Sequence, residues 1–173
     1  MIEALIFVVF PFCMVFAAVS DMVSMTIANR VSLILIATFA VVAPLSGMGL
    51  DAYGWHFAAA GLVLTVTFSL FALGAMGGGD AKLLAATSLW MGLSLELLAY
   101  LVYASVIGGL LTVLILMYRG SIWSAYTGRY MLLRHFANSK AGIPYGVALG
   151  VSGLIVYPST PLMQWALARL TAI

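Results

Sequence analysis

Two aspartates stand beside apolar stretches of this chain, where a carboxylate is costly. Asp21 follows the first apolar run, and Asp80 ends the segment Gly77-Gly78-Gly79-Asp80 between two further apolar runs. Ionisable groups at a membrane boundary are rare and tend to mark functional sites. Two carboxylates held close together share a proton, so that one can activate water while the other donates a hydrogen bond. The pair is a candidate for acid/base chemistry if the fold brings its members together.

The composition predicts an all-α, polytopic membrane protein. The chain has 173 residues, of which 65% are hydrophobic and 7% charged, whereas a soluble domain carries about 25% charged residues. We expect one membrane-embedded domain over residues 1–173. The first apolar run lacks the basic start of a signal peptide, since no Lys or Arg precedes Arg30, and we expect it to be retained. A net charge of +2 gives no reason to expect a nucleic-acid partner.

Six transmembrane helices are expected from windows of about 20 apolar residues. Residues 81–118 are too long for one span, and a break near Gly92-Leu93-Ser94 would make two short ones. The expected spans are 3–20, 31–47, 55–75, the two halves of 81–118, and 142–157. Residues 119–141 form either an amphipathic surface helix or a loop over the site, and 158–173 a tail along the membrane interface.

Basic residues decide the expected topology, because Lys and Arg collect on the cytoplasmic side. Six spans place on one side Arg30, Lys82, Arg119, Arg129, Arg134 and Lys140. The opposite side holds Arg169, Glu3, Asp51 and Glu96. This model puts the N-terminus outside and both aspartates at the cytoplasmic face.

Each aspartate also has a purely structural interpretation. Asp80 could cap the helix that follows it, and Asp21 could be a solvated loop residue. Three consecutive glycines exceed what a cap requires, and they would give a peptide room to approach. Lys82 should turn away from Asp80 on a helix, and we expect it to anchor to lipid phosphate.

A metal site or cofactor is not expected. Cys13 is the one cysteine of the chain, which excludes a disulfide or a CxxC zinc site within it. His56 and His135 fall in different loops or helix ends.

Three motifs carry a resemblance to a known family. Residues 77–83 (Gly-Gly-Gly-Asp-Ala-Lys-Leu) resemble the GxGD signature of membrane aspartyl proteases, in the form typical of type IV prepilin peptidases. Asp21 followed by residues 27–30 (Ile-Ala-Asn-Arg) resembles the family's other catalytic stretch, in which Ile-Pro-Asn follows an Asp; Ala28 replaces that Pro, and residues 23–26 lack the usual basic residues. Residues 143–146 (Ile-Pro-Tyr-Gly) are similar to the Pro-Tyr-Gly element that opens the family's last helix.

This resemblance implies an aspartic endopeptidase of the bacterial inner membrane that removes the cytoplasmic leader of type IV or Flp prepilins. Asp21 and Asp80 would be catalytic. Residues that would bind substrate or shape loops are Gly77, Gly78, Gly79, Asn29, Pro144 and Tyr145. The partners would be a prepilin or pseudopilin precursor and membrane lipid. The chain most resembles the short, peptidase-only members associated with tight-adherence (Flp) pili, and we do not expect N-methylation, because the four-cysteine domain linked to it is missing. An ion-coupled transporter and a non-catalytic assembly subunit remain open.

Overall fold

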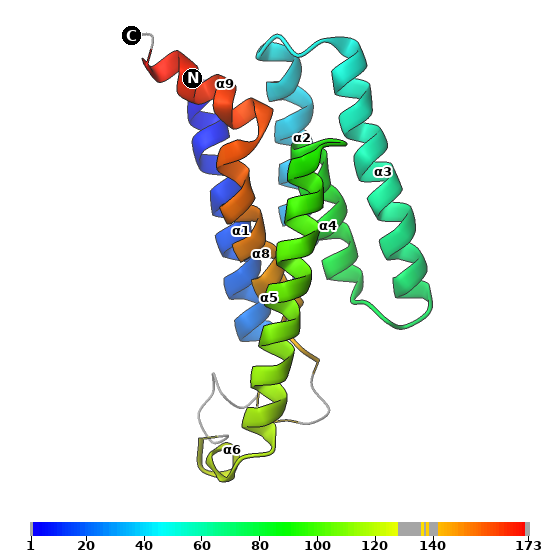
Figure 1. Ribbon diagram of the computed structural model, residues 1–173, viewed down its shortest axis with the longest axis vertical. Helices are drawn as coiled ribbons and strands as arrows, with labels where there is room; N and C mark the ends of the chain where they lie inside the picture. Colours follow the sequence, from blue (N-terminus) through cyan, green and yellow to red (C-terminus); the bar gives the residue numbers. More distant parts are fainter. Residues whose placement is uncertain (1, 128–135, 137, 139–141, 172–173) are drawn as a thin grey trace.

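The computed structural model describes residues 2–127, 136, 138 and 142–171, and the regular structure of this part is helical (Figure 1). The elements are α1 (Ile2–Ser24), α2 (Asn29–Leu45), α3 (Leu50–Ala72), α4 (Gly78–Met91), α5 (Leu95–Arg119), α6 (Ile122–Thr127), α8 (Tyr145–Val156), the 3-10 helix η1 (Tyr157–Ser159) and α9 (Pro161–Thr171).

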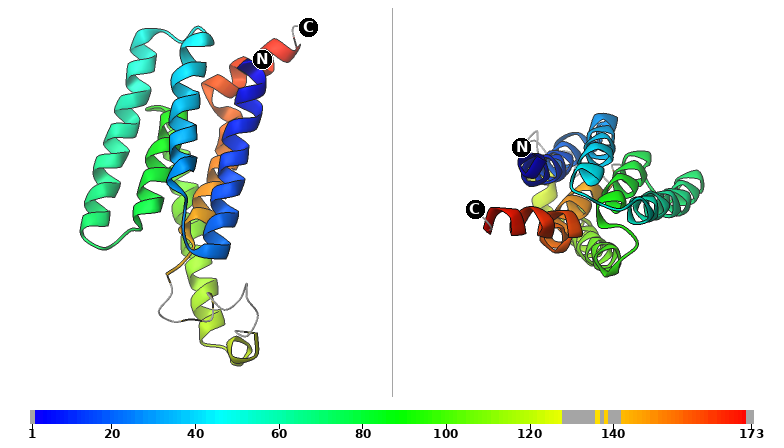
Figure 2. Two further views of the ribbon diagram at one scale, coloured as in Figure 1. Left: turned by 180° about the vertical axis from the view of Figure 1, so that it is seen from behind. Right: turned by 90° about the horizontal axis from the view of Figure 1, so that it is seen from above.

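The long helices run up and down in one bundle (Figure 1). Helix α1 packs against α8 and α2, α5 packs against α8, and α3 lies at the edge against α4 (Figure 2). The chain reverses between consecutive long helices, so α1 and α3 end where α2 and α4 begin, and α5 runs beyond the start of α8 on the same side (Figure 1). We call this the site end of the bundle.

Helices α1 and α4 reach further towards the site end than the sequence windows predict. Helix α1 continues to Ser24, so Asp21 lies in its last turn and is buried. Helix α4 begins at Gly78, so Asp80 is its third residue; the N-cap is Gly77, and no side chain caps it. The solvated-loop interpretation of Asp21 and the capping interpretation of Asp80 are therefore wrong. Hydropathy windows stop at a polar residue, whereas a helix continues wherever that residue finds a partner.

A polytopic, all-helical membrane protein is confirmed over the described residues, but six full-length spans are not. Helices α1, α3 and α5 are long and apolar enough to cross a membrane, and the pair α8–η1 and α9, bent by 50°, makes a fourth if it counts as one span. Helix α2 has 17 residues and α4 only 14. Most residues of α4 are buried inside the protein. Its apolar sequence therefore reflects the protein core as well as the membrane.

The break predicted near Gly92-Leu93-Ser94 is confirmed. Gly92 ends α4 with a φ of 70°, a conformation that favours glycine. The Ser94 side chain then caps α5 by accepting a hydrogen bond from the Leu97 N–H at 3.4 Å. The C-terminal tail forms α9, which packs on α1.

Charge is divided between the two ends of the described bundle. Arg30, Lys82 and Arg119 belong to helix ends at the site end. Arg169 lies at the other end, 4.0 Å from Glu3. The expected topology and the assessment of metal sites also used four residues that lie outside the described part of the chain: Arg129, Arg134, His135 and Lys140.

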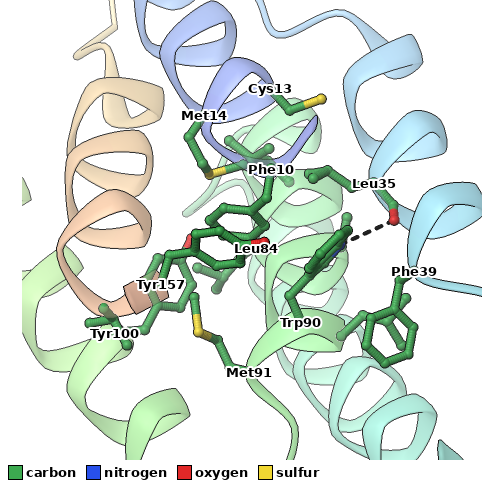
Figure 3. Packing of buried hydrophobic residues seen from close by; sticks show 14 of the residues in the cluster. Phe10, Cys13, Met14, Leu35, Phe39, Leu84, Trp90, Met91, Tyr100 and Tyr157 are labelled. Carbon is green, nitrogen blue, oxygen red and sulfur yellow. Dashed lines mark hydrogen bonds between the residues drawn. The ribbon is translucent and has the colours of Figure 1, made fainter. Parts of the chain in front are cut away.

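A cluster of aromatic side chains fixes the bundle (Figure 3). The rings of Phe10 and Tyr157 stack with centroids 4.0 Å apart, and Trp90 packs against both. Trp90 Nε1 donates to the Leu35 carbonyl at 3.1 Å, and the Tyr157 hydroxyl donates to the Ile6 carbonyl at 2.7 Å. Each polar tip thus has a partner, as burial of Trp and Tyr requires. The cluster joins α1, α2, α4 and η1, the elements that carry or adjoin the site.

Candidate active site

Asp21 is held at the site end by the start of α8. Its side chain is buried, and its Oδ2 accepts a hydrogen bond from the backbone N–H of Gly146 at 2.6 Å. Gly146 is the second residue of α8 after the N-cap Pro144, so this N–H has no partner within the helix. A carboxylate is a favourable acceptor there, because a helix N-terminus carries partial positive charge. The contact therefore fixes one aspartate in a defined orientation.

Small size at position 146 is what permits this contact. A β-carbon on Gly146 would lie 2.8 Å from Cβ and 2.9 Å from Oδ2 of Asp21. The neighbouring Tyr145 ring packs over Gly108 of α5, where a β-carbon would lie 2.7 Å from the ring. The Tyr145 ring thus packs the start of α8 against α5.

Asp80 lies in the first turn of α4 and is half-buried. Its carboxylate turns back towards Gly77, where a β-carbon would lie 2.7 Å from Oδ2. At Gly78 a β-carbon would lie 3.1 Å from the Phe71 ring. The glycines beside Asp80 therefore leave space that other residues would fill.

The two carboxylates are neighbours that interact electrostatically, although they are 59 positions apart in the sequence. Ile27 lies beside the glycine that precedes Asp80 and beside the glycine that binds Asp21. Its Cβ would be 3.3 Å from a β-carbon on Gly79, and its Cδ1 would be 2.8 Å from one on Gly146. The fold thus brings together the aspartates, the glycine motif and the start of α8.

The connection between α1 and α2 crosses this region. Asn29 begins α2, and its Oδ1 accepts a hydrogen bond from Lys82 Nζ at 3.0 Å. The Lys82 ammonium thus binds a side chain of the protein, and its role as a lipid anchor stays a prediction. Sequence reasoning missed this contact, together with those of Ile27 and Gly146, because residues far apart in the chain make them. The motif similarity around residues 27–30 and 143–146 was the signal that could have found them.

The remaining acidic residues lie away from the pair. They lie in the first turns of three helices at the end opposite the site: Glu3 in α1, Asp51 in α3 and Glu96 in α5. Within the described residues, no three His, Cys, Asp or Glu side chains are grouped to hold a metal ion. His56 instead contacts the Leu89 carbonyl at 2.7 Å.

Comparison with known protein families gives one match. The model of the type IV leader peptidase family matches residues 8–113, more than half of the chain. The matched segment contains Asp21, Asn29 and Asp80 and ends before Pro144. Searches against curated proteins and against solved structures found no match. On the strength of the family match, this chain belongs to the type IV leader peptidase family.

Proposed function

We propose that this protein is an aspartic endopeptidase that removes the leader peptide from type IV or Flp prepilins. The observation that carries this proposal is the meeting of Asp21 and Asp80 at one end of the bundle, with glycines around both carboxylates. A pair of neighbouring carboxylates suits acid/base hydrolysis, because each disfavours ionisation of the other. The family match supports a leader peptidase in general.

The proposed chemistry is hydrolysis without a covalent intermediate. The ionised aspartate takes a proton from water as the water oxygen attacks the scissile carbonyl carbon. The protonated aspartate donates a hydrogen bond to the developing oxyanion. When the C–N bond breaks, a proton passes from the pair to the leaving amine, and a leader with a free carboxylate is released. The pair titrates as a unit, so we assign neither proton to one residue.

The proposed substrate has a hydrophilic leader, a small residue before the cut and a hydrophobic helix. Such a precursor could place its leader at the site end while its helix stays in lipid. The space beside Gly77 and Gly79 suits an extended peptide. The basic residues Arg30, Lys82 and Arg119 at the site end support a cytoplasmic position, since cytoplasmic ends of spans are enriched in Lys and Arg.

Cleavage of purified precursor tests this function. The protein in proteoliposomes should convert an intact Flp prepilin to a shorter product, and mass spectrometry should place the cut between leader and helix. A precursor with a bulky residue in place of the small one before the cut is the matched control and should stay uncut. Failure to cleave any intact precursor of this class would contradict the proposal and favour an assembly subunit or a transporter.

A further inference from the structure

The two aspartates lie on helices that pack mainly on other partners. Helix α1 packs against α8 and α2, whereas α4 packs against α3 and α2 and less extensively against α8. The separation of the carboxylates therefore depends on the elements that contact both helices. At the site end, these include the start of α8 and the connection of residues 25–28 with the first residue of α2, Asn29.

This connection is fastened to α1 beside Asp21. Ser20, the residue before Asp21, donates its hydroxyl to the Thr26 carbonyl at 2.8 Å. Ser24 donates to the Ser20 carbonyl at 2.7 Å, and its hydroxyl lies 2.8 Å from that of Thr26. The chain between them turns at Met25, whose φ is 53°. A residue other than glycine is rarely found in that conformation, and the conformation persists only where the surrounding structure holds the residue in place.

The same connection is fastened to α4 beside Asp80. Ile27 lies against Gly79, the residue before Asp80. Lys82, two residues after Asp80, donates to Asn29 Oδ1 at 3.0 Å. A hydrogen bond with a charged donor is stronger than a neutral one. These two contacts lay the connection along the first turn of α4.

We propose that residues 25–29 set the separation of the two aspartates, and that Asn29 and Lys82 are positioning residues for the hydrolytic pair. This inference rests on the proposed function. Loss of the Lys82–Asn29 hydrogen bond would free the connection from α4 and let the carboxylates move apart. Neither side chain is assigned a contact with substrate. The loss should therefore lower kcat and leave KM unchanged.

Kinetics of a double-mutant cycle test the pairing. Lys82→Met and Asn29→Leu should each lower kcat for precursor cleavage by about 10-fold to 100-fold, the effect expected of small misplacements. The double variant should be no slower than either single variant, because both remove one interaction. Asn29→Asp and Lys82→Arg, which keep an acceptor and a donor, should recover most of the rate. Arg30→Gln is the matched control, since it removes a neighbouring exposed cation, and its kcat should equal that of the parent.

Three kinetic outcomes would overturn the inference. Additive losses in the double variant would show independent roles. A rise in KM with kcat unchanged would place Lys82 or Asn29 against substrate. An equal loss in Arg30→Gln would indicate a general effect of surface charge.

Hydrogen–deuterium exchange in nanodiscs separates this inference from the proposed function, because it needs no substrate. Lys82→Met should speed exchange in residues 25–31 and 77–82, whereas Arg30→Gln should not. If that pattern appears in a protein that cleaves no precursor, the proposed function fails and the positioning role stands. Unchanged exchange in Lys82→Met would contradict the positioning role even in an active enzyme.

Discussion

The helices of the bundle pack together at two levels along its length, the aromatic cluster and the site end, and the two levels differ in the size of the side chains at the contacts. At the aromatic cluster, large rings fill the space, and Trp90 and Tyr157 each satisfy their polar atom on a backbone carbonyl. At the site end, close approach depends on missing side chains, at Gly77, Gly79 and Gly146. One level therefore resists rearrangement, while the other keeps space beside two carboxylates. Functional sites are where proteins depart from full packing, and the difference separates residues that maintain the fold from residues proposed to perform the reaction.

Replacing either aspartate should break the site end without affecting the aromatic level. Asp21→Asn and Asp80→Asn keep the shape of the side chain but cannot exchange the shared proton. We expect the rate of precursor cleavage to fall by about 100-fold to 10,000-fold, the range of acid/base contributions. The midpoint of thermal unfolding should stay near that of the parent. Asp51→Asn and Glu96→Gln, at the opposite end, are controls and should cleave normally. Normal processing by Asp21→Asn or Asp80→Asn would refute the aspartic mechanism.

Gly77→Ala should give the next largest loss of cleavage. The added β-carbon would lie 2.7 Å from Asp80 Oδ2, and the carboxylate would have to rotate away from its present position. We expect a decrease of about 10-fold to 100-fold in kcat with little change in stability. Gly61→Ala is the matched control, since a β-carbon there meets open space on α3. Equal rates for both variants would show that the space beside Asp80 is not needed.

Gly79→Ala should have a smaller effect on cleavage than Gly77→Ala. Its β-carbon would lie 3.3 Å from Ile27 Cβ and 3.6 Å from the Ile27 backbone, so the connection must shift by a few tenths of an ångström. Alanine also favours a helix over glycine by about 1 kcal/mol, which offsets part of the crowding. Cleavage rate and thermal unfolding, measured on one preparation, should show a kinetic loss that exceeds any loss of stability. Full activity would mean that the contact with Ile27 is dispensable.

Trp90→Phe should affect stability and leave the chemistry alone. It removes the hydrogen bond to the Leu35 carbonyl, at a cost of about 1 kcal/mol in the free energy of unfolding. The rate per folded molecule should equal that of the parent, measured after quantifying the folded fraction. A decrease in kcat without a loss of stability would show that the aromatic cluster affects the chemistry at the site end, and would contradict the separation of the two levels.

The sequence predicted which residues share an end of the bundle, because alternating helices place Asp21 and Asp80 together. It also located the turn at Gly92, where glycine and serine are strong local signals. It could not predict the Gly146 N–H donated to Asp21, because that bond joins residues 125 positions apart and depends on how α8 packs. The Lys82–Asn29 bond was missed for the same reason. The prediction of six spans is not confirmed, because burial in a protein and exposure to lipid select the same apolar residues, as in α4.

The shortness of α4 has a consequence for the surrounding bilayer. Fourteen residues make a helix about 21 Å long, whereas the hydrocarbon core of a membrane is about 30 Å thick. The two ends of α4 therefore cannot both lie at undisturbed membrane surfaces. Where the Asp80 end is the one below the surface, water reaches Asp80 only if the lipid is locally thinned or displaced. Thinning a bilayer costs free energy that grows with the mismatch. We expect cleavage in nanodiscs to quicken as the lipid acyl chains are shortened, so that the thickness of the membrane itself would set the supply of water to the peptide bond.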